Sequence, residues 1–286
     1  MSRVLARIRG LVVVTLLLVP NVPATSSEPS KPNVPRPVLG ILGAMTIEVE
    51  ELQKQMTDQN ERTVRGVRFV TGTLNGRRVV LAHSGIGGVN AGVATALMWE
   101  HFEPARVLFT GIAGGLNPDL GPCDIVIGRQ TAHHDFGELG AKEFRPFPTV
   151  SPIDGKANPL FFPADAGLLA AAEKAGKGLE LAEVNTLKGA RVPRVVTGVI
   201  VTGNQFVASP AKREELRRTL KADATEMEGA AVAQVCWQYR VPCLVVRSLS
   251  DDAGEQAAAA YERFQQTAAR NSARLVVGIL AQLPAK

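Results

Sequence analysis

Short hydrophobic runs alternate with longer amphipathic stretches along the chain from about residue 38 onward. The short runs end in glycine or polar residues, which predicts buried strands, whereas the longer stretches repeat apolar residues at three- and four-residue steps, which predicts helices. Strands that alternate with helices indicate a largely parallel sheet covered by helices on both faces. The predicted strands cover residues 38–42, 69–74, 77–82, 106–109, 124–128, 194–202 and 243–246, and the predicted helices begin at Thr46 or cover 89–102, 164–176, 211–220 and 261–283.

Residues 225–254 place two sets of polar residues at the ends of predicted elements. Glu226 and Glu228 are predicted to open a helix. The inner face of that helix is expected to hold the apolar residues at helical spacing, Val232, Val235, Cys236 and Tyr239. The strand at 243–246 is predicted to end in a polar set, Arg247, Ser248, Ser250, Asp251 and Asp252. Ligands of open α/β sheets bind beyond the carboxyl ends of the strands, so both sets are expected to face one small molecule.

Two connections differ in how much the sequence says about them. Asn75-Gly76 between two strand patterns predicts a tight hairpin turn. Residues 132–163 have no regular pattern and include a proline-rich tract, which predicts a long loop that acts as a lid, contacts a partner or is disordered. His133 and His134 fall in this segment and are expected at its surface.

The N-terminus has the three parts of a secretory signal: basic Arg3, Arg7 and Arg9, an apolar run over 11–20, and small residues up to Ala24. We therefore expect a signal peptide at 1–24, a disordered Ser- and Pro-rich linker at 25–37, and one domain at 38–286. An uncleaved N-terminal anchor is the alternative. Cleavage predicts a periplasmic or secreted protein without stable membrane association.

Composition is that of a globular protein of 286 residues, with 45% hydrophobic and 21% charged residues. The formal charge of +5 falls to +2 without the three N-terminal arginines, since 29 basic and 27 acidic residues remain. With 5% aromatic residues and no basic and aromatic residues interleaved, the sequence gives no support for nucleic-acid binding.

The chain has 3 cysteines, too few for a disulfide framework. Cys236 and Cys243 lie on apolar faces of adjacent predicted elements, where buried free thiols are common. A bridge between them is possible in an oxidising compartment, provided that the Cβ geometry allows it. Cys123 is expected in a loop. Neither C-x-x-C nor a histidine cluster at metal spacing occurs, so no metal site and no cofactor is expected.

Two glycine-rich strand exits, at 84–88 and 111–115, allow close approach of a ligand to backbone N–H groups. Tight α/β turns use glycine for steric reasons alone, so either exit is explained equally well without a ligand. Glu48 follows the first strand and reaches the same edge, although an acid there also stabilises a helix N-terminus. Asp251 is more informative, because a carboxylate at the exit of an apolar strand is costly to bury without a function or a partner.

Several of these motifs together resemble the nucleoside phosphorylase superfamily, and within it the 5′-methylthioadenosine/S-adenosylhomocysteine nucleosidases. They occur in the family's order at 40–45 with Glu48, 84–87, 110–116, 201–206, 225–230 and 245–251, and the resemblance covers nearly all of residues 38–283. E-M-E-G and V-V-R-S-L-S-D are its most specific parts. The resemblance implies a three-layer α/β/α fold around a mixed, partly closed sheet, a homodimer, and hydrolysis of the N-glycosidic bond of 5′-substituted adenosines.

The resemblance also implies roles for individual residues. Asp251 would be the general acid toward N7 of adenine, oriented by Ser250. Glu48 would activate the attacking water, which Arg247 would help to place. The implied substrate-binding residues are Met45, Ile86, Ala113, Gly114, Phe206 stacking on the base, Val207 reading the adenine edge through its backbone, Met227 packing on the sugar, Glu228 binding the ribose hydroxyls, and Ser250.

The sequence departs from the family pattern at two positions. Ile112 stands where a hydroxyl residue near the water is familiar, and Asn204 stands where an acid is common. Two other functions remain open. A phosphorolytic enzyme of the same fold would use phosphate, but the two glycine-rich exits carry no cation and Glu48 would repel phosphate. An exported nucleoside-binding protein would keep the pocket without turnover.

Overall fold

The structure is a computed structural model that describes residues 39–284, apart from 142 and 188. The predicted signal peptide and linker lie outside these residues. The main sheet has eleven strands: β1 (Leu39–Gly43), β2 (Thr57–Val64), β3 (Val67–Leu74), β4 (Arg77–His83), β5 (Val107–Phe109), β6 (Ile112–Gly115), β7 (Ile125–His133), β10 (Phe162–Pro163), β13 (Val195–Thr202), β14 (Ala224–Glu226) and β15 (Cys243–Asp251). Two hairpins lie outside it, β8 (Gly137–Leu139) with β9 (Phe144–Pro146), and β11 (Val184–Thr186) with β12 (Gly189–Arg191).

The strand order is β10-β7-β13-β14-β6-β15-β5-β1-β4-β3-β2, and β7 pairs with β15 as well. This extra pairing closes β7, β13, β14, β6 and β15 on themselves, while β5 to β2 continue as an open sheet. β1 pairs in parallel with β4 and β5, β15 with β5 and β6, and β13 with β7 and β14, whereas β15 with β7 and β14 with β6 are antiparallel. The predicted mixed, partly closed sheet is confirmed.

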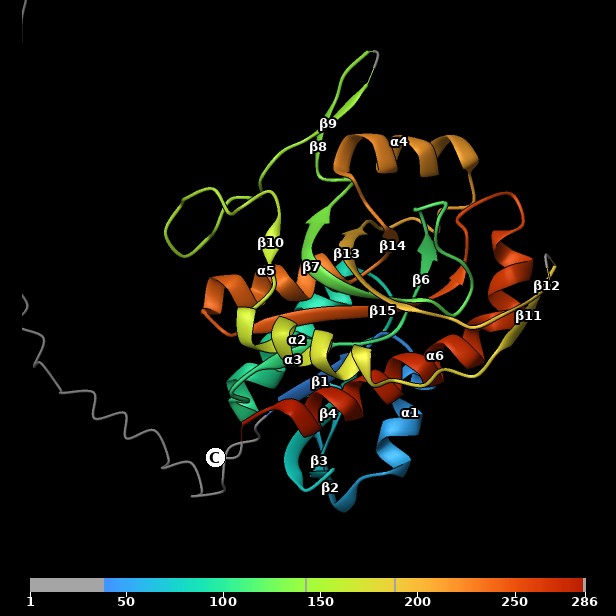
Figure 1. The fold of residues 1–286 in the computed structure, drawn as a ribbon. Coiled ribbons are helices and arrows are strands. Elements are labelled where there is room, and N and C mark those ends of the chain that lie inside the picture. The colour runs from blue at the N-terminus through green and yellow to red at the C-terminus, as the bar shows by residue number, and fades with distance from the viewer. Residues whose placement is uncertain (1–38, 142, 188, 285–286) are drawn as a thin grey trace, which may run out of the picture. The chain divides into compact units, whose positions relative to one another are not determined.

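Helices cover both faces of the sheet (Figure 1). They are α1 (Thr46–Lys54), α2 (Gly88–Phe102), α3 (Ala166–Lys177), α4 (Pro210–Leu220), α5 (Gly229–Tyr239) and α6 (Ala257–Gln282). One hydrophobic core joins α1, α3 and α6 to the sheet, and another joins α2 and α5 to its other face. Leu216 and Leu220 of α4 pack in a separate cluster against β13. The three-layer α/β/α arrangement predicted from the sequence is therefore confirmed.

β15 differs from its prediction and organises the site. It does not end at Val246 but continues through Arg247 to Asp251, and each of its nine residues is buried. The polar half is tolerated because polar partners meet it: the Ser248 hydroxyl donates to the Cys123 carbonyl, and the Ser250 hydroxyl donates to the Asp251 carboxylate. Sequence pattern alone shows that these side chains are polar but not that partners meet them.

The start of the predicted helix at Glu226 is wrong as well. Glu226 ends the short strand β14, and α5 begins at Gly229 with Glu228 as its N-cap. The Glu226 carboxylate accepts hydrogen bonds from the N–H groups of Glu228 and Gly229, and this fixes the turn between strand and helix. On α5, Val232 and Cys236 are buried as predicted, whereas Tyr239 is 43% exposed.

The boundaries of the other elements differ less from their predictions. α1 begins at Thr46, but its cap is the Glu48 carboxylate, which accepts from the Met45 N–H. α6 begins at Ala257, before the predicted start at 261. The Asn75-Gly76 hairpin is confirmed, and both residues have positive φ, 49° and 71°. Strand β2 was not predicted, because nearly all its side chains are exposed and polar.

The segment 132–163 is not a bare loop. It holds the end of β7, the β8–β9 hairpin and β10. His133 and His134 are not surface loop residues, since His133 ends β7 and contacts Gln234, while His134 is 1% exposed. Burial lowers the pKa of both imidazoles.

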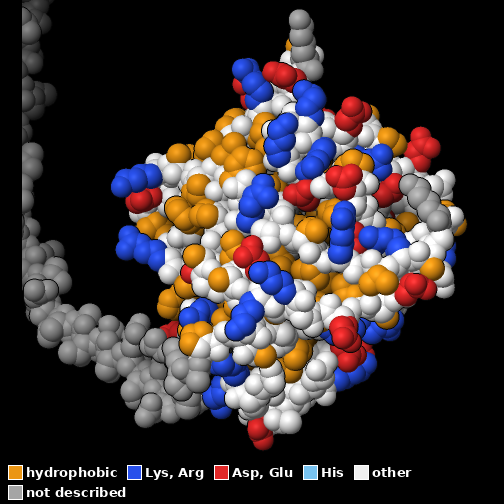
Figure 2. All heavy atoms as spheres, in the orientation of Figure 1, with side chains coloured by type: hydrophobic (Ala, Val, Ile, Leu, Met, Phe, Trp, Pro, Cys, Tyr) orange, Lys and Arg blue, Asp and Glu red, His pale blue; other side chains and the backbone are white. Residues whose placement is uncertain are grey.

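On the face seen in Figure 2, Lys and Arg side chains lie among Asp and Glu side chains, with hydrophobic side chains between them. Within residues 39–284, no helix is both long and apolar enough to cross a membrane.

Candidate active site

The candidate site is built where β1, β6, β14 and β15 end and α1, α2 and α5 begin. These ends bring together the carboxylates of Glu48, Glu226, Glu228 and Asp251, and each of these four residues is 7% exposed or less. A buried ionised carboxylate is stable only with compensating donors or charges. The four carboxylates differ in the donors and charges that surround them, and these differences suit them to different chemical roles.

Glu48 is held by backbone N–H groups. Its Oε2 accepts from Ala44 at 2.6 Å and from Met45 at 2.9 Å, and its Oε1 accepts from Ile112 at 2.9 Å. A Cβ at Gly111 would collide with this carboxylate, so glycine at that strand exit has a steric reason. Burial raises the pKa of Glu48, although the Arg247 charge and the three N–H groups oppose the rise.

Asp251 ends β15 and is 3% exposed. Its Oδ2 accepts from the Ser250 hydroxyl and its Oδ1 from the Ala253 N–H, both at 2.8 Å. Within the described part of the chain, no cation lies within ion-pair distance of this carboxylate. Burial therefore raises the pKa of Asp251, against the smaller opposing effect of its two hydrogen bonds.

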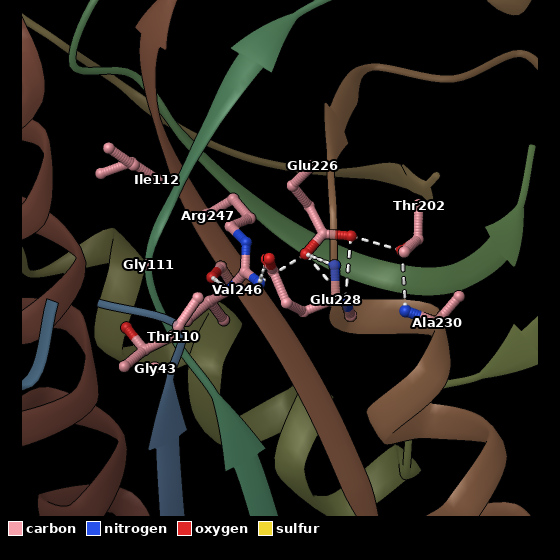
Figure 3. Close-up of polar contacts among 12 residues, drawn as sticks. Gly43, Thr110, Gly111, Ile112, Thr202, Glu226, Glu228, Ala230, Val246 and Arg247 are labelled. Carbon is pink, nitrogen blue, oxygen red and sulfur yellow. Dashed lines mark hydrogen bonds and ion pairs between the residues drawn. The ribbon is translucent and has the colours of Figure 1, made fainter. Parts of the chain in front are cut away.

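Arg247 is 1% exposed and lies against Glu226 (Figure 3). Its Nη2 is 2.5 Å from Oε2 of Glu226 and 3.9 Å from Oε2 of Glu228, and its guanidinium carbon lies 4.1 Å from the centroid of the Phe109 ring. Among the described residues, its Nε has no hydrogen-bond partner. Arg247 thus reaches the site already neutralised by Glu226.

Glu226 was predicted to lie at the site, but at the start of a helix and without a role of its own. Besides Arg247, it accepts from the Thr202 hydroxyl, which itself accepts from the Ala230 N–H (Figure 3). The predicted helix at Glu226 gave no indication that its carboxylate would fix the turn between β14 and α5. The alternation in T-E-M-E, with period two, is the signal that would have indicated a strand.

Glu228 caps α5 and accepts from the Gly87 N–H at 2.8 Å. Burial, followed by the negative charge of Glu226, raises the pKa of Glu228 to about 7. The Gly88 N–H is used by the Asn204 side chain, whose backbone N–H donates to Asp135. The first glycine-rich exit therefore binds protein side chains through its N–H groups.

The predicted substrate-binding residues surround these carboxylates unevenly. Ile86 and Phe206 are 55% and 52% exposed, whereas Val207 is buried. Met45 and Met227, beside Glu48 and Glu228, are half-buried. Ala113, Gly114 and Ser250 are placed together by β6 and β15, and a Cβ at Gly114 would lie 2.9 Å from Oδ1 of Asp251.

Tyr261 of α6 also belongs to the site and was not singled out in the sequence. Its hydroxyl contacts the Met45 sulfur at 3.4 Å, and its ring meets Phe206 edge-on at 6.0 Å. Burial and the charges of Glu48 and Asp251 raise its pKa. Phe206 and Tyr261 lie 55 residues apart in the sequence, so no local sequence pattern links the two rings.

No group of three or more metal-binding side chains that could hold an ion occurs in the described residues. The site combines three carboxyl groups with different surroundings. Asp251 is buried without an ion-pair partner among the described residues, Glu48 accepts hydrogen bonds from backbone N–H groups, and Glu228 has a pKa of about 7. Such a set can donate a proton, accept one, and bind hydroxyl groups.

The family model described as the phosphorylase superfamily matches residues 38–281. A 5′-methylthioadenosine/S-adenosylhomocysteine nucleosidase of Psychromonas ingrahamii is 40% identical over 222 residues, 77% of this chain and 88% of the relative. One of Mycobacterium bovis is 37% identical over 233 residues, 80% of this chain and 91% of the relative.

Solved structures agree. The same nucleosidase of Neisseria meningitidis, in complex with methylthio-immucillin-A, has a TM-score of 0.72 and 37% identity, and the match covers 86% of this chain and 99% of that one. Futalosine hydrolase of Helicobacter pylori has a TM-score of 0.73 and 32% identity, with 86% and 97% covered. The chain therefore belongs to the phosphorylase superfamily and, within it, to the 5′-methylthioadenosine/S-adenosylhomocysteine nucleosidases.

Proposed function

We propose that this protein hydrolyses the N-glycosidic bond of 5′-substituted adenosines, such as 5′-methylthioadenosine, and releases adenine. The observation that carries the proposal is a pair of buried carboxylates, Glu48 in the first turn of α1 and Asp251 at the end of β15, neither of which has an ion-pair partner among the described residues. One carboxylic acid and one carboxylate around a scissile glycosidic bond are what hydrolysis by direct displacement with water needs.

Asp251 acts as the general acid. Adenine is a poor leaving group as an anion, so a proton delivered to N7 stabilises its departure. The raised pKa keeps Asp251 protonated to higher pH than an exposed aspartate, and Ser250 and Ala253 hold the carboxyl in one orientation. Adenine leaves with the proton that Asp251 donated, and solvent then reprotonates Asp251.

Glu48 acts as the general base. As the bond to adenine lengthens, C1′ gains positive charge, which a carboxylate stabilises. Glu48 takes a proton from the water that attacks C1′, while the N–H groups of Ala44, Met45 and Ile112 hold its oxygens in place. Ile112 contributes this backbone N–H, which does not depend on its side chain. The lack of a side-chain hydroxyl at Ile112 therefore does not change the position of the Glu48 carboxylate.

The other residues bind and position. The ionised form of Glu228 accepts hydrogen bonds from the ribose hydroxyls, with Met227 against the sugar. Phe206 stacks on the base, and the backbone of Val207 meets the adenine edge. Met45, Ile86, Ala113, Gly114 and the ring of Tyr261 enclose the nucleoside. Arg247 holds Glu226 and adds positive potential near Glu48 and Glu228.

Water rather than phosphate is the nucleophile, for two reasons. Phosphate needs cations and free N–H donors. Here the Ile112 N–H already donates to Glu48, and Arg247 is already paired with Glu226. A phosphate at this position would meet the Glu48 charge at short range and be repelled.

The test is adenine release from 5′-methylthioadenosine by the purified protein in phosphate-free buffer and again with added phosphate. Equal release in both buffers is expected. Release only with phosphate would make the enzyme a phosphorylase. No release in either, together with saturable binding of the nucleoside, would make it a binding protein.

We further propose a homodimer formed through α2 and α5, which pack side by side. Val89 and Val93 of α2 are 79% and 52% exposed, and Trp237 of α5 is 47% exposed. Exposed apolar side chains gathered on one face favour association. Sedimentation should give a dimer for the wild type and a monomer for Val93→Glu. A monomeric wild type would contradict this interface.

We also propose export, followed by cleavage after Ala24. The support is the basic and apolar N-terminal pattern alone. N-terminal sequencing of the protein recovered outside the inner membrane should begin at Thr25. Recovery of an intact chain from the cytosolic fraction would contradict it.

A further inference from the structure

Two of the three cysteines lie together at the end of β15 opposite the candidate site. Cys243 is the first residue of β15, and Cys236 lies on the last turns of α5. A hydrogen bond with the Cys243 thiol, followed by burial, raises the pKa of the Cys236 thiol, and both thiols are free. The third cysteine, Cys123, is fully buried in a different cluster.

The chain between the two thiols is short and tightly turned. Arg240 adopts the left-handed conformation, with φ of 57°, and the Val241 N–H donates to the Cys236 carbonyl at 2.8 Å. This turn brings the start of β15 back beside the end of α5, where the two cysteines lie near each other. Both also pack in the same hydrophobic core.

A cavity of about 780 Å³ leads to this pair. Both cysteines line it, together with Phe162 of β10 and with Trp237 and Gln238 of α5. Cys243 is 9% exposed and Cys236 2%, so Cys243 is the more exposed residue of the two. A small molecule in the cavity can therefore reach a thiol that the surface of the protein otherwise covers.

We propose that Cys236 and Cys243 form an intramolecular disulfide by exchange with a small-molecule disulfide. The Cys243 thiolate attacks one sulfur of the reagent and releases the first reduced thiol. The Cys236 thiolate then attacks the mixed disulfide at the Cys243 sulfur and releases the second. The protein loses two electrons and two protons, and the reagent gains both as two thiols.

The bridge would join the two elements that carry the site at their far ends. α5 begins at Glu228 and β15 ends at Asp251, whereas the thiols lie at the other end of each element. A bridge there constrains the unfolded chain without touching a site residue. Turnover should therefore be the same in the oxidised and reduced forms, and the oxidised form should unfold at a higher urea concentration.

Peptide mapping gives a direct test. Trypsin cuts after Lys221, Arg240 and Arg247, so Cys236 and Cys243 fall on different peptides, 222–240 and 241–247, and Cys123 on 107–129. The purified protein is equilibrated with excess glutathione disulfide, blocked with an alkylating reagent and digested. We expect 222–240 linked to 241–247, separable by reduction, and one alkylated cysteine, Cys123.

The matched variants are Cys243→Ala and Cys123→Ala, each removing one buried thiol. Cys123→Ala should keep the linked peptides, and Cys243→Ala should lose them and leave two alkylated cysteines. Three alkylated cysteines in the wild type, or a bridge that includes Cys123, would overturn the proposal. The wild-type map decides the matter even if a variant does not fold.

Discussion

Two buried aspartates in this molecule have opposite surroundings. Asp124, just before β7, is 0% exposed, and its carboxylate lies 2.8 Å from Nη2 of Arg191 and 3.9 Å from Nε of Arg194. Asp251, at the end of β15, is 3% exposed, and its partners among the described residues are the Ser250 hydroxyl and the Ala253 N–H. Burial alone does not identify a catalytic acid. Among the described residues, no cation lies close enough to Asp251 to form an ion pair and oppose the effect of burial, which raises the pKa of its carboxyl group.

The same contrast holds between the glutamates. Glu226 meets Arg247 and so fixes the backbone between β14 and α5. Glu48 is held by N–H groups alone and stays available to accept a proton. In both pairs the ion-paired acid stabilises the structure around it, and the acid without an ion pair is the one proposed for the chemistry.

The largest effect should follow from Asp251→Asn. An amide cannot deliver a proton to N7, so turnover should fall by about 10²–10⁴-fold. The free energy of unfolding should not fall, because the amide keeps acceptor and donor capacity without the cost of a buried charge. Adenine release and urea unfolding measure the two. Asp252→Asn is the control, since that side chain is 63% exposed. Turnover near the wild-type level in Asp251→Asn would show that Asp251 is not the general acid.

Glu48→Gln should lower turnover by about 10²-fold or more, because the amide oxygen can still accept from Ile112 but cannot take a proton from water. Nucleoside affinity should be largely kept, as measured by calorimetry. Glu50→Gln, on the exposed side of the same helix and paired with Lys54, is the matched control. An equal loss in both variants would point to damage to α1 rather than to loss of a base.

Asp124→Asn should have the opposite outcome from Asp251→Asn. Removing one charge of a buried pair leaves the other uncompensated, but Arg191 is 27% exposed, so we expect a loss of about 2 kcal/mol in the free energy of unfolding. Turnover at 25 °C should stay at the wild-type level. If Asp124→Asn lost activity without losing stability, the contrast between the two aspartates would be wrong.

Glu228 should make stability depend on pH. Its pKa rises from an ordinary value of 4.5 to about 7 on folding. The folded protein then holds a proton that the unfolded chain has released. The contribution to stability is full below about 4.5 and is lost as the pH rises through about 7, by about 3 kcal/mol in all. Urea unfolding between these pH values should show the fall in wild type and a flatter profile in Glu228→Gln. Identical profiles would mean that Glu228 titrates normally.

The smallest effect should come from Tyr261→Phe. It removes the hydroxyl from the Met45 sulfur and keeps the ring against Phe206, so KM for 5′-methylthioadenosine should change by about fivefold or less. Tyr261→Ala removes the ring and should raise KM further. If Tyr261→Phe and Tyr261→Ala behaved alike, the ring would have no part in binding.

The sequence predicted the layers, most strands and the pair Glu48 and Asp251, because hydrophobic periodicity and polar residues at strand ends are local features. It did not predict the strand character of Glu226, the continuation of β15 through Arg247, or the site position of Tyr261. These depend on partners far along the chain: Thr202 and Arg247 for Glu226, and Met45 and Phe206 for Tyr261. His134 was misplaced for the same reason, since it is buried against Gly203.

In the proposed mechanism, Asp251 keeps its proton to a higher pH than an exposed aspartate does, because burial raises its pKa. The direct measurement is an NMR titration of ¹³C-labelled aspartate carboxyl groups, with the Asp251 signal assigned by its loss in Asp251→Asn. A midpoint above the ordinary value of 3.8 is predicted. A midpoint at or below that value would contradict the account, because Asp251 would then be a carboxylate with no proton to give.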